Sequence, residues 1–189
     1  MIRPLQRGSD PMTQTLETRV ARPMLLSETD IIIDYFHSAS PEFLNILGVD
    51  PSRLPERAQW KARFEHLFSL PIEERNFFAI LWEIDGRPAG WSSADRIVFG
   101  EEAYMHLHVL DPARRGQGNG TFFVRESANI YFDILRISRL FCEPHALNVA
   151  PNRTLQAAGF KYVKTHETVP GPLNFHQPVT RWLLERGAV

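Results

Sequence analysis

Two histidines stand at alternate positions of a strand-like run that leads into a glycine-rich loop. The run covers residues 104–109, YMHLHV, so Tyr104, His106 and His108 share one face of an extended strand. Histidine titrates near neutral pH, which suits a general base that takes a proton from a nucleophile. Ordinary hydrogen-bonded packing on a sheet face is the alternative for both residues. We predict no metal site, and the single cysteine excludes a cysteine-rich one.

The loop that follows places three glycines within five positions. It reads DPARRGQGNGTFF over residues 111–123, and an apolar helix-like run comes next. A strand, a glycine loop and a helix together favour phosphate binding, because free N–H groups at the helix start face outward and glycine removes the obstructing Cβ. Gly116, Gly118 and Gly120 therefore indicate a pyrophosphate site, with a simple glycine-rich turn as the alternative. The G-x-G-x-G spacing matches neither the P-loop nor the dinucleotide fingerprint.

The elements around these residues predict one domain of mixed α/β (α+β) class. Residues 1–19 are expected to form a loose tail, and residues 20–189 the domain. Helical spacing of apolar residues predicts helices after Ser27, over 41–47, over 56–69, after the glycine loop and over 151–158. Extended apolar runs predict strands near 77–82, 88–98, 102–110, 140–143, 160–166 and 175–184.

Composition excludes several classes of protein. The chain has 189 residues and a net charge of −1, which argues against a nucleic-acid partner. No stretch approaches the roughly 20 apolar residues of a membrane span, and the start of the chain lacks the apolar core of a secretory signal. We therefore expect a cytoplasmic protein that binds neither membranes nor nucleic acid.

Two motifs together resemble the GCN5-related N-acetyltransferases, the GNAT family. The first is R-x-x-G-x-G, Arg115 to Gly120, and the second joins Glu143-Pro144, Asn148 and Gly159-Phe160. The resemblance implies a central, mostly antiparallel mixed sheet that is flanked by helices and splayed between its fourth and fifth strands. It also implies acetyl-CoA as acyl donor, with no metal. The residues implied to bind CoA are Val109, Leu110 and Asp111 along the pantetheine, Arg115, Gly116, Gln117, Gly118, Asn119, Gly120 and Thr121 at the pyrophosphate, and Asn148 on the pantetheine arm.

A finer resemblance concerns the catalytic groups. The segment from His106 to Pro112 is similar to the siderophore hydroxylysine acyltransferases, and the Glu143 to Asn148 spacing to these and to aminoglycoside 6′-N-acetyltransferases. By that resemblance His106 is the base and Glu167 the carboxylate that orients it. His108 and His145 compete for the same role.

The expected activity is acyl-CoA-dependent transfer, most simply of an acetyl group, to the amine or hydroxylamine of a small molecule. Direct transfer within a ternary complex is expected, since Cys142 lies in a strand without a base at short spacing. A protein or aminoglycoside acceptor remains open, and Asp95, Glu101 and Glu102 would provide the acidic lining that an aminoglycoside needs. A non-catalytic CoA-binding sensor is the alternative outside enzymes, and a homodimer is compatible with the sequence.

Overall fold

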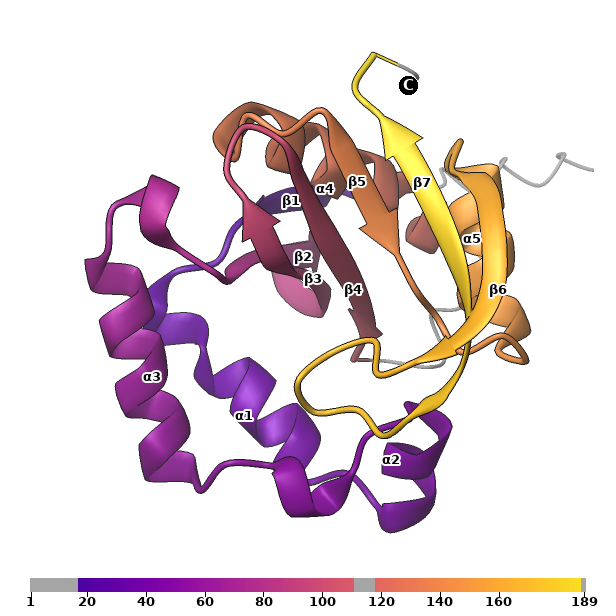
Figure 1. Cartoon of the computed structure of the whole chain (residues 1–189). Helices are drawn as coiled ribbons and strands as arrows, with labels where there is room; N and C mark the ends of the chain where they lie inside the picture. The colour runs from indigo at the N-terminus through magenta and orange to yellow at the C-terminus, as the bar shows by residue number, and fades with distance from the viewer. Residues whose placement is uncertain (1–16, 111–117, 188–189) are drawn as a thin grey trace, which may run out of the picture.

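The computed structural model describes residues 17–110 and 118–187. These residues form a seven-stranded sheet with helices on both faces (Figure 1). The strands are β1 (Arg19–Pro23), β2 (Phe78–Ile84), β3 (Arg87–Val98), β4 (Glu102–Val109), β5 (Arg139–Cys142), β6 (Lys161–Thr168) and β7 (Gln177–Glu185). The α-helices are α1 (Asp30–His37), α2 (Pro41–Ile46), α3 (Arg57–Ser69), α4 (Asn119–Ile134) and α5 (Val149–Ala157).

The sheet order is β1-β2-β3-β4-β5-β7-β6, and every neighbouring pair is antiparallel except the parallel pair β4–β5. This arrangement confirms the expected fold class. Among the described residues, no helix has both the length and the apolar character that crossing a membrane requires.

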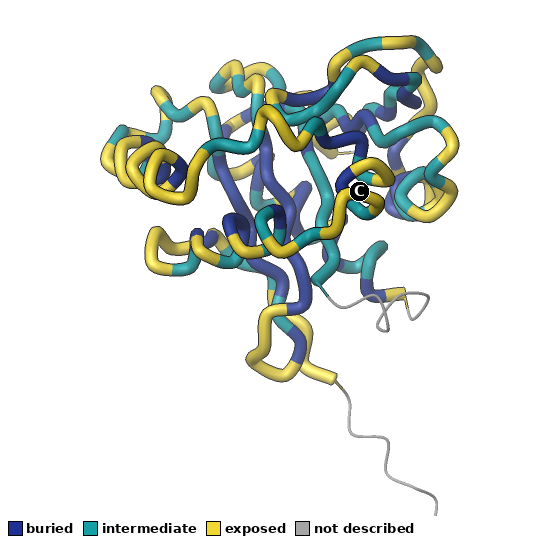
Figure 2. The backbone as a smooth tube through the Cα atoms, turned by 90° about the horizontal axis from the view of Figure 1, so that it is seen from below, coloured by how far each residue is buried: buried dark blue, intermediate teal, exposed yellow. Residues whose placement is uncertain are grey.

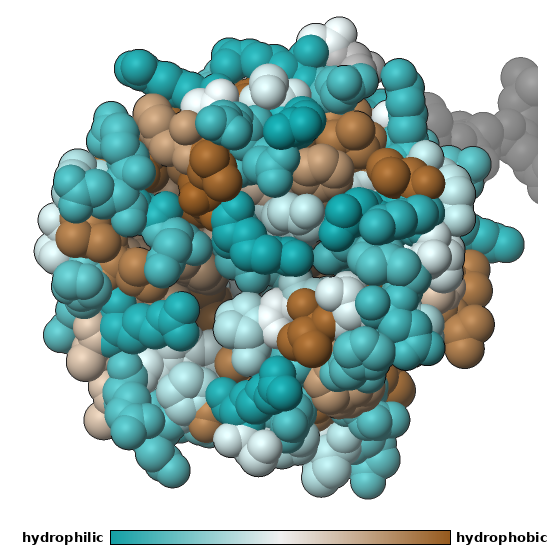
Figure 3. Space-filling model, viewed as in Figure 1, coloured by the Kyte–Doolittle hydropathy of each residue, from teal (hydrophilic) through white to brown (hydrophobic). Residues whose placement is uncertain are grey.

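The sheet separates two hydrophobic cores. Strand β2 is buried on both faces: Ile80 and Trp82 pack with α4 and α5, whereas Ala79 and Leu81 pack with α1, α2 and α3. A strand that is buried on both faces has a continuous run of apolar residues rather than alternating apolar and polar ones. Buried residues accordingly gather along the central strands and on the inner sides of the helices (Figure 2). The outer face seen in Figure 3 is mainly hydrophilic, with hydrophobic side chains in small groups.

Strand β1 is an element that the sequence analysis did not predict. Its sequence, RVARP, carries two arginines and a proline, so it has no strand-like alternation. The strand forms because it pairs with the edge of β2, where the Arg22 guanidinium contacts the carboxylates of Glu28 and Glu83 at 2.6 and 2.9 Å. The predicted helices and the other six strands are confirmed to within a few residues.

The splay predicted between the fourth and fifth strands lies between β4 and β5. Their pairing ends at Met105 and Cys142, whereas β3 stays paired with β4 as far as Val109. The Leu110 amide donates to the Ala89 carbonyl on β3 at 3.0 Å. Because backbone groups alternate in direction along an antiparallel pair, those of Leu107 and Val109 face the opposite edge, toward the splay. A ligand that enters the splay thus meets strand backbone.

Candidate active site

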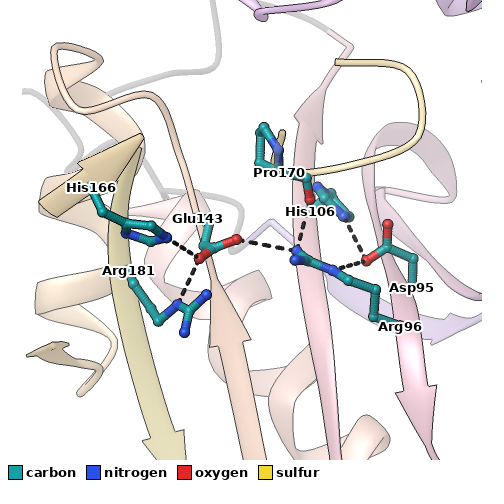
Figure 4. Close-up of polar contacts among 7 residues, drawn as sticks. All are labelled: Asp95, Arg96, His106, Glu143, His166, Pro170 and Arg181. Atoms are coloured by element: carbon teal, nitrogen blue, oxygen red, sulfur yellow. Dashed lines mark hydrogen bonds and ion pairs between the residues drawn. The ribbon is translucent and has the colours of Figure 1, made fainter. Parts of the chain in front are cut away.

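His106 and Asp95 form the central polar pair of the site (Figure 4). Tyr104 and His106 on β4 pair with Asp95 and Ser93 on β3, so the four side chains share a face of the sheet. His106 Nε2 lies 3.1 Å from Asp95 Oδ1, a close contact without the alignment of a hydrogen bond. Burial alone would raise the pKa of Asp95, but the facing His106 and Arg96 outweigh it and keep that pKa below its usual value. Asp95 therefore remains a carboxylate at neutral pH.

A backbone distortion brings Arg96 onto this same face. Residues 95 and 96 follow each other, so a regular strand would point them to opposite faces. The register of β3 shifts between Asp95 and Val98, and Arg96 has a φ of +46°. Its guanidinium consequently lies 3.5 Å from the centre of the Tyr104 ring. Left-handed backbone is unfavourable for a non-glycine residue by about 1 kcal/mol, so the contacts of Arg96 must offset that strain.

Those contacts join three parts of the chain at one guanidinium (Figure 4). Arg96 Nη2 donates to the Pro170 carbonyl at 2.7 Å and to Glu143 Oε2 at 3.3 Å. The Glu143 carboxylate, only 1% exposed, also accepts from Arg181 Nε at 2.6 Å and lies 3.4 Å from His166 Nε2. A buried carboxylate requires such partners. Arg96 therefore connects β3, the end of β5 and the β6–β7 connection.

The β6–β7 connection covers the His106 and Asp95 pair. A Cβ added at Gly171 would lie 3.2 Å from His106 Cε1 and 2.8 Å from Asn174 Oδ1. Farther along, the Phe175 amide donates to the Gly48 carbonyl at 3.1 Å, and the Asp50 amide to the Leu173 carbonyl at 2.8 Å. The connection is thus fixed to the chain that follows α2, and a residue without a side chain faces His106.

His108 is enclosed by aromatic rings. It stacks on Trp91 with ring centres 4.5 Å apart and meets the edges of Tyr35 and Phe36. This enclosure, and secondarily the nearby His106, lowers the pKa of His108 to about 3. His108 is therefore neutral at physiological pH and a weak base.

The structure does not bring Glu167 into contact with His106 within the described residues. Glu167 lies on β6 with its side chain 65% exposed, and its carboxylate is 3.3 Å from His176 Nδ1. Asp95 occupies the position beside His106 that the resemblance implied for Glu167. The signal for Asp95 was available, because a hairpin between the 88–98 and 102–110 strands pairs Ser93 and Asp95 with the His106 face. From the sequence, Asp95 is expected only in an acidic lining, and Arg96 is not expected at the site.

A cavity of about 200 Å³ lies next to these groups. Its lining includes His106, His108, His145 and Asn148. The His145 Nδ1 atom accepts a hydrogen bond from the Leu147 amide at 3.2 Å. The Asn148 side-chain amide makes no hydrogen bond to another described residue, and is free to bind a ligand. Of the other expected acidic residues, Glu102 pairs with Arg139 at 2.8 Å, outside the cavity lining, and Glu101 is exposed.

The described part of the glycine loop forms the start of α4. Gly118 is the N-cap with a φ of +78°, and Asn119, Gly120 and Thr121 form the first turn. A Cβ at Gly120 would lie 3.3 Å from Thr154 Cγ2, so this glycine also permits close packing between α4 and α5. The predicted ligands Asp111, Arg115, Gly116 and Gln117 lie outside the described residues.

A further cation lies at the same end of α4. The exposed Arg19 of β1 stacks 4.2 Å from the centre of the Phe122 ring, and its Nη1 donates to Asn119 Oδ1 at 3.5 Å. This arginine was not predicted, because β1 itself was not. It adds positive charge beside the helix N-terminus, where the macrodipole already favours an anion.

Within residues 17–110 and 118–187, no three histidine, cysteine, aspartate or glutamate side chains are arranged to hold a metal ion.

Several solved structures with the same fold are described as N-acetyltransferases. The aminoglycoside acetyltransferase AAC(6')-Ib in complex with ribostamycin and coenzyme A superposes with a TM-score of 0.68 at 16% identity, over 90% of this chain and 95% of that one. The spermidine N-acetyltransferase of Vibrio cholerae, in complex with CoA and spermine, gives 0.67 at 14% identity over 90% and 96%. RimL, a ribosomal L7/L12 α-N-protein acetyltransferase in complex with CoA, gives 0.69 at 15% identity over 95% and 98%.

Sequence comparison gives the family. No curated protein sequence matches the chain. The sequence model of the Acetyltransferase (GNAT) family matches residues 36–160, which span both cores, the splayed strands and the start of α4. The chain therefore belongs to the GNAT family of acetyltransferases.

Proposed function

We propose that this protein transfers an acetyl group from acetyl-CoA to the amine or hydroxylamine of a small molecule, with His106 as the general base. The observation that carries the proposal is the position of the His106 and Asp95 pair, one residue beyond the point where β4 parts from β5. A reactive thioester in the splay and a base beside it are what the reaction requires.

The acyl donor fits the splay and the start of α4. The N–H groups of the first turn of α4 have no intrahelical acceptor and suit a pyrophosphate, to which Arg19 adds positive charge. The pantetheine arm would run along Val109 and Leu110, and the Asn148 amide, which lines the cavity, would bind it. A backbone N–H of Leu107 or Val109 would donate to the thioester oxygen as negative charge develops there.

The two ring nitrogens of His106 have different roles: Nε2 lies next to Asp95, and Nδ1 accepts a proton. With its proton on Nε2, the ring nitrogen that lies 3.1 Å from Asp95, His106 accepts the proton of the attacking nitrogen on the lone pair of Nδ1. The nitrogen then bonds to the thioester carbon, the carbon–sulfur bond breaks, and the CoA thiolate takes up a proton. Asp95 stabilises the charged ring without being protonated itself.

Transfer is direct rather than through an acylated cysteine. Cys142, the only cysteine in the sequence, is buried at the end of β5. Burial raises the pKa of its thiol far above the usual range, with Glu143 adding to the shift. A protonated thiol is a poor nucleophile, so the acceptor nitrogen attacks acetyl-CoA itself.

The test is an assay of thiol release from acetyl-CoA with a panel of acceptors: N6-hydroxylysine, lysine, 2-phenylethylamine, a polyamine, an aminoglycoside and short peptides. Mass spectrometry identifies the acetylated product, and calorimetry measures CoA binding on the same sample. Thiol release matched by an acetylated amine supports the proposal. CoA binding without any acetylated product would favour the sensor, and absence of CoA binding would contradict the account of the splay.

A further inference from the structure

The acceptor side of the cavity is walled by aromatic rings that hold one another in place. Phe36 of α1 stacks near Trp60 of α3 at 5.7 Å between ring centres, and Trp60 stacks near Phe64 at 6.2 Å. Phe64 in turn contacts Phe77 at 5.4 Å, and Trp91 lies beside Phe36 at 6.3 Å. All five rings line the cavity. Mutually packed rings form a rigid apolar surface that fits flat apolar groups.

The charges of the lining disfavour a ligand with several positive charges. Two carboxylates line the cavity among the described residues, Asp95 and Glu143, and both already face cations within the protein. Because protein cations already balance both negative charges, neither carboxylate is available to pair with a second ammonium group of a ligand. A polycation would therefore lose its hydration at this wall without gaining partners, which is costly.

One basic side chain, Arg63, adds a positive charge to the lining of the cavity. Arg63 of α3 is exposed and lines the cavity, and no hydrogen bond or ion pair joins its side chain to another residue in the described part of the chain. Its unneutralised charge repels additional ammonium groups on an acceptor. Size points the same way, because the volume of about 200 Å³ is below the roughly 300–1,000 Å³ of pockets for drug-sized ligands.

We infer that the acceptor is a small monoamine or hydroxylamine on an apolar, preferably aromatic, body, and that polyamines and aminoglycosides are poor acceptors. This inference rests on the proposed function and narrows its acceptor. The reacting nitrogen lies at His106, and the apolar body lies against the rings of Phe36, Trp60, Phe64, Phe77 and Trp91.

The experiment compares kcat/KM for acceptors that share a primary amine and differ in the rest of the molecule. The acceptors are 2-phenylethylamine, hexylamine, putrescine, spermidine and kanamycin, each with saturating acetyl-CoA. We expect kcat/KM for 2-phenylethylamine to exceed that for putrescine by at least about tenfold, because the second charge of putrescine meets an apolar wall. Equal or higher values for putrescine, spermidine or kanamycin would overturn the inference and leave the acetyl transfer intact. Absence of thiol release with these acceptors and also with the hydroxylamine of the first panel would instead overturn the proposed function.

A charge reversal at Arg63 separates the role of charge from that of shape. Arg63→Glu is expected to raise kcat/KM for putrescine several-fold relative to that for 2-phenylethylamine. The matched control is Arg87→Glu, an exposed arginine at the start of β3 outside the cavity lining. It changes the net charge equally and is expected to leave the ratio unchanged. Equal shifts of the ratio in both variants would show that overall charge, not this wall, selects the acceptor.

Discussion

At the scale of single residues, two titratable neighbours on one sheet face have opposite surroundings. Asp95 is largely buried, yet its pKa stays below the usual value because His106 and Arg96 face it. His108 faces aromatic rings, and its pKa falls to about 3. The same strand pair thus holds a carboxylate that is charged and an imidazole that is neutral at physiological pH, and the proposal assigns the role of base to His106, which lies beside the carboxylate.

The low pKa of His108 predicts an acid-sensitive contribution to stability. In the unfolded chain His108 binds a proton below about pH 6.5. In the folded chain the ring of His108 stays neutral until the pH falls to about 3. Over that window the free energy of unfolding falls with decreasing pH, by at most about 1.4 kcal/mol per pH unit from this group. His108→Phe keeps a ring against Trp91 and removes the proton site.

Chemical denaturation of both proteins at a series of pH values measures this contribution. The stability of His108→Phe relative to wild type is expected to rise as the pH falls from about 7 to about 4. Other groups titrate equally in both proteins and cancel in the difference. A difference that stays constant with pH would show that His108 protonates as readily in the folded chain as in the unfolded one.

At the scale of elements, the bulge in β3 and the β6–β7 connection depend on each other. Arg96 reaches Tyr104, Glu143 and Pro170 only because its backbone is left-handed, and Gly171 follows directly after the carbonyl that Arg96 holds. The connection that covers His106 is therefore tied to the strand that carries Asp95. A strained backbone conformation persists where the surrounding contacts stabilise it by more than the strain costs.

Arg96→Lys tests this coupling, because lysine keeps the charge but lacks the planar fork that contacts several acceptors at once. We expect a loss of about 1–3 kcal/mol in the free energy of unfolding, since one ammonium group does not reproduce the contacts of the guanidinium with Asp95, Glu143 and the Pro170 carbonyl together. The matched control is Arg139→Lys, whose guanidinium pairs with Glu102 at a more exposed site, and for which we expect a loss below about 1 kcal/mol. Urea denaturation of the two variants gives the comparison, and equal losses would contradict a special role for Arg96.

At the scale of the whole molecule, the proposed reaction requires the donor and the acceptor to meet at the splayed sheet. One core, on the side of α4 and α5, supports the start of α4 and the backbone edge of β4. The other core, on the side of α1, α2 and α3, provides the aromatic wall. The sheet lies between them (Figure 1), and it carries the His106 and Asp95 pair on strands β4 and β3.

Local sequence patterns predicted the parts of this arrangement that depend on local physics. The apolar runs that became β2, β3 and β4, and the alternation that placed His106 and His108 together, are visible in the sequence. Strand β1 was missed because its sequence is strand-like only when paired with β2. Arg96 was missed because its direction depends on a bulge, and Gly171 because its contact with His106 joins distant segments.

The measurement that tests the central claim most directly is the rate of acetyl transfer by His106→Gln, together with its affinity for CoA. We expect kcat to fall by about 10²–10⁴-fold, because the base is lost, with the Kd for CoA unchanged. Asp95→Asn should lose part of that rate, with partial rescue by Asp95→Glu. His66→Gln, at an exposed histidine of α3 outside the cavity lining, is the control and should keep the full rate. A His106→Gln variant that transfers acetyl groups as fast as wild type would contradict the assignment of His106 as the base.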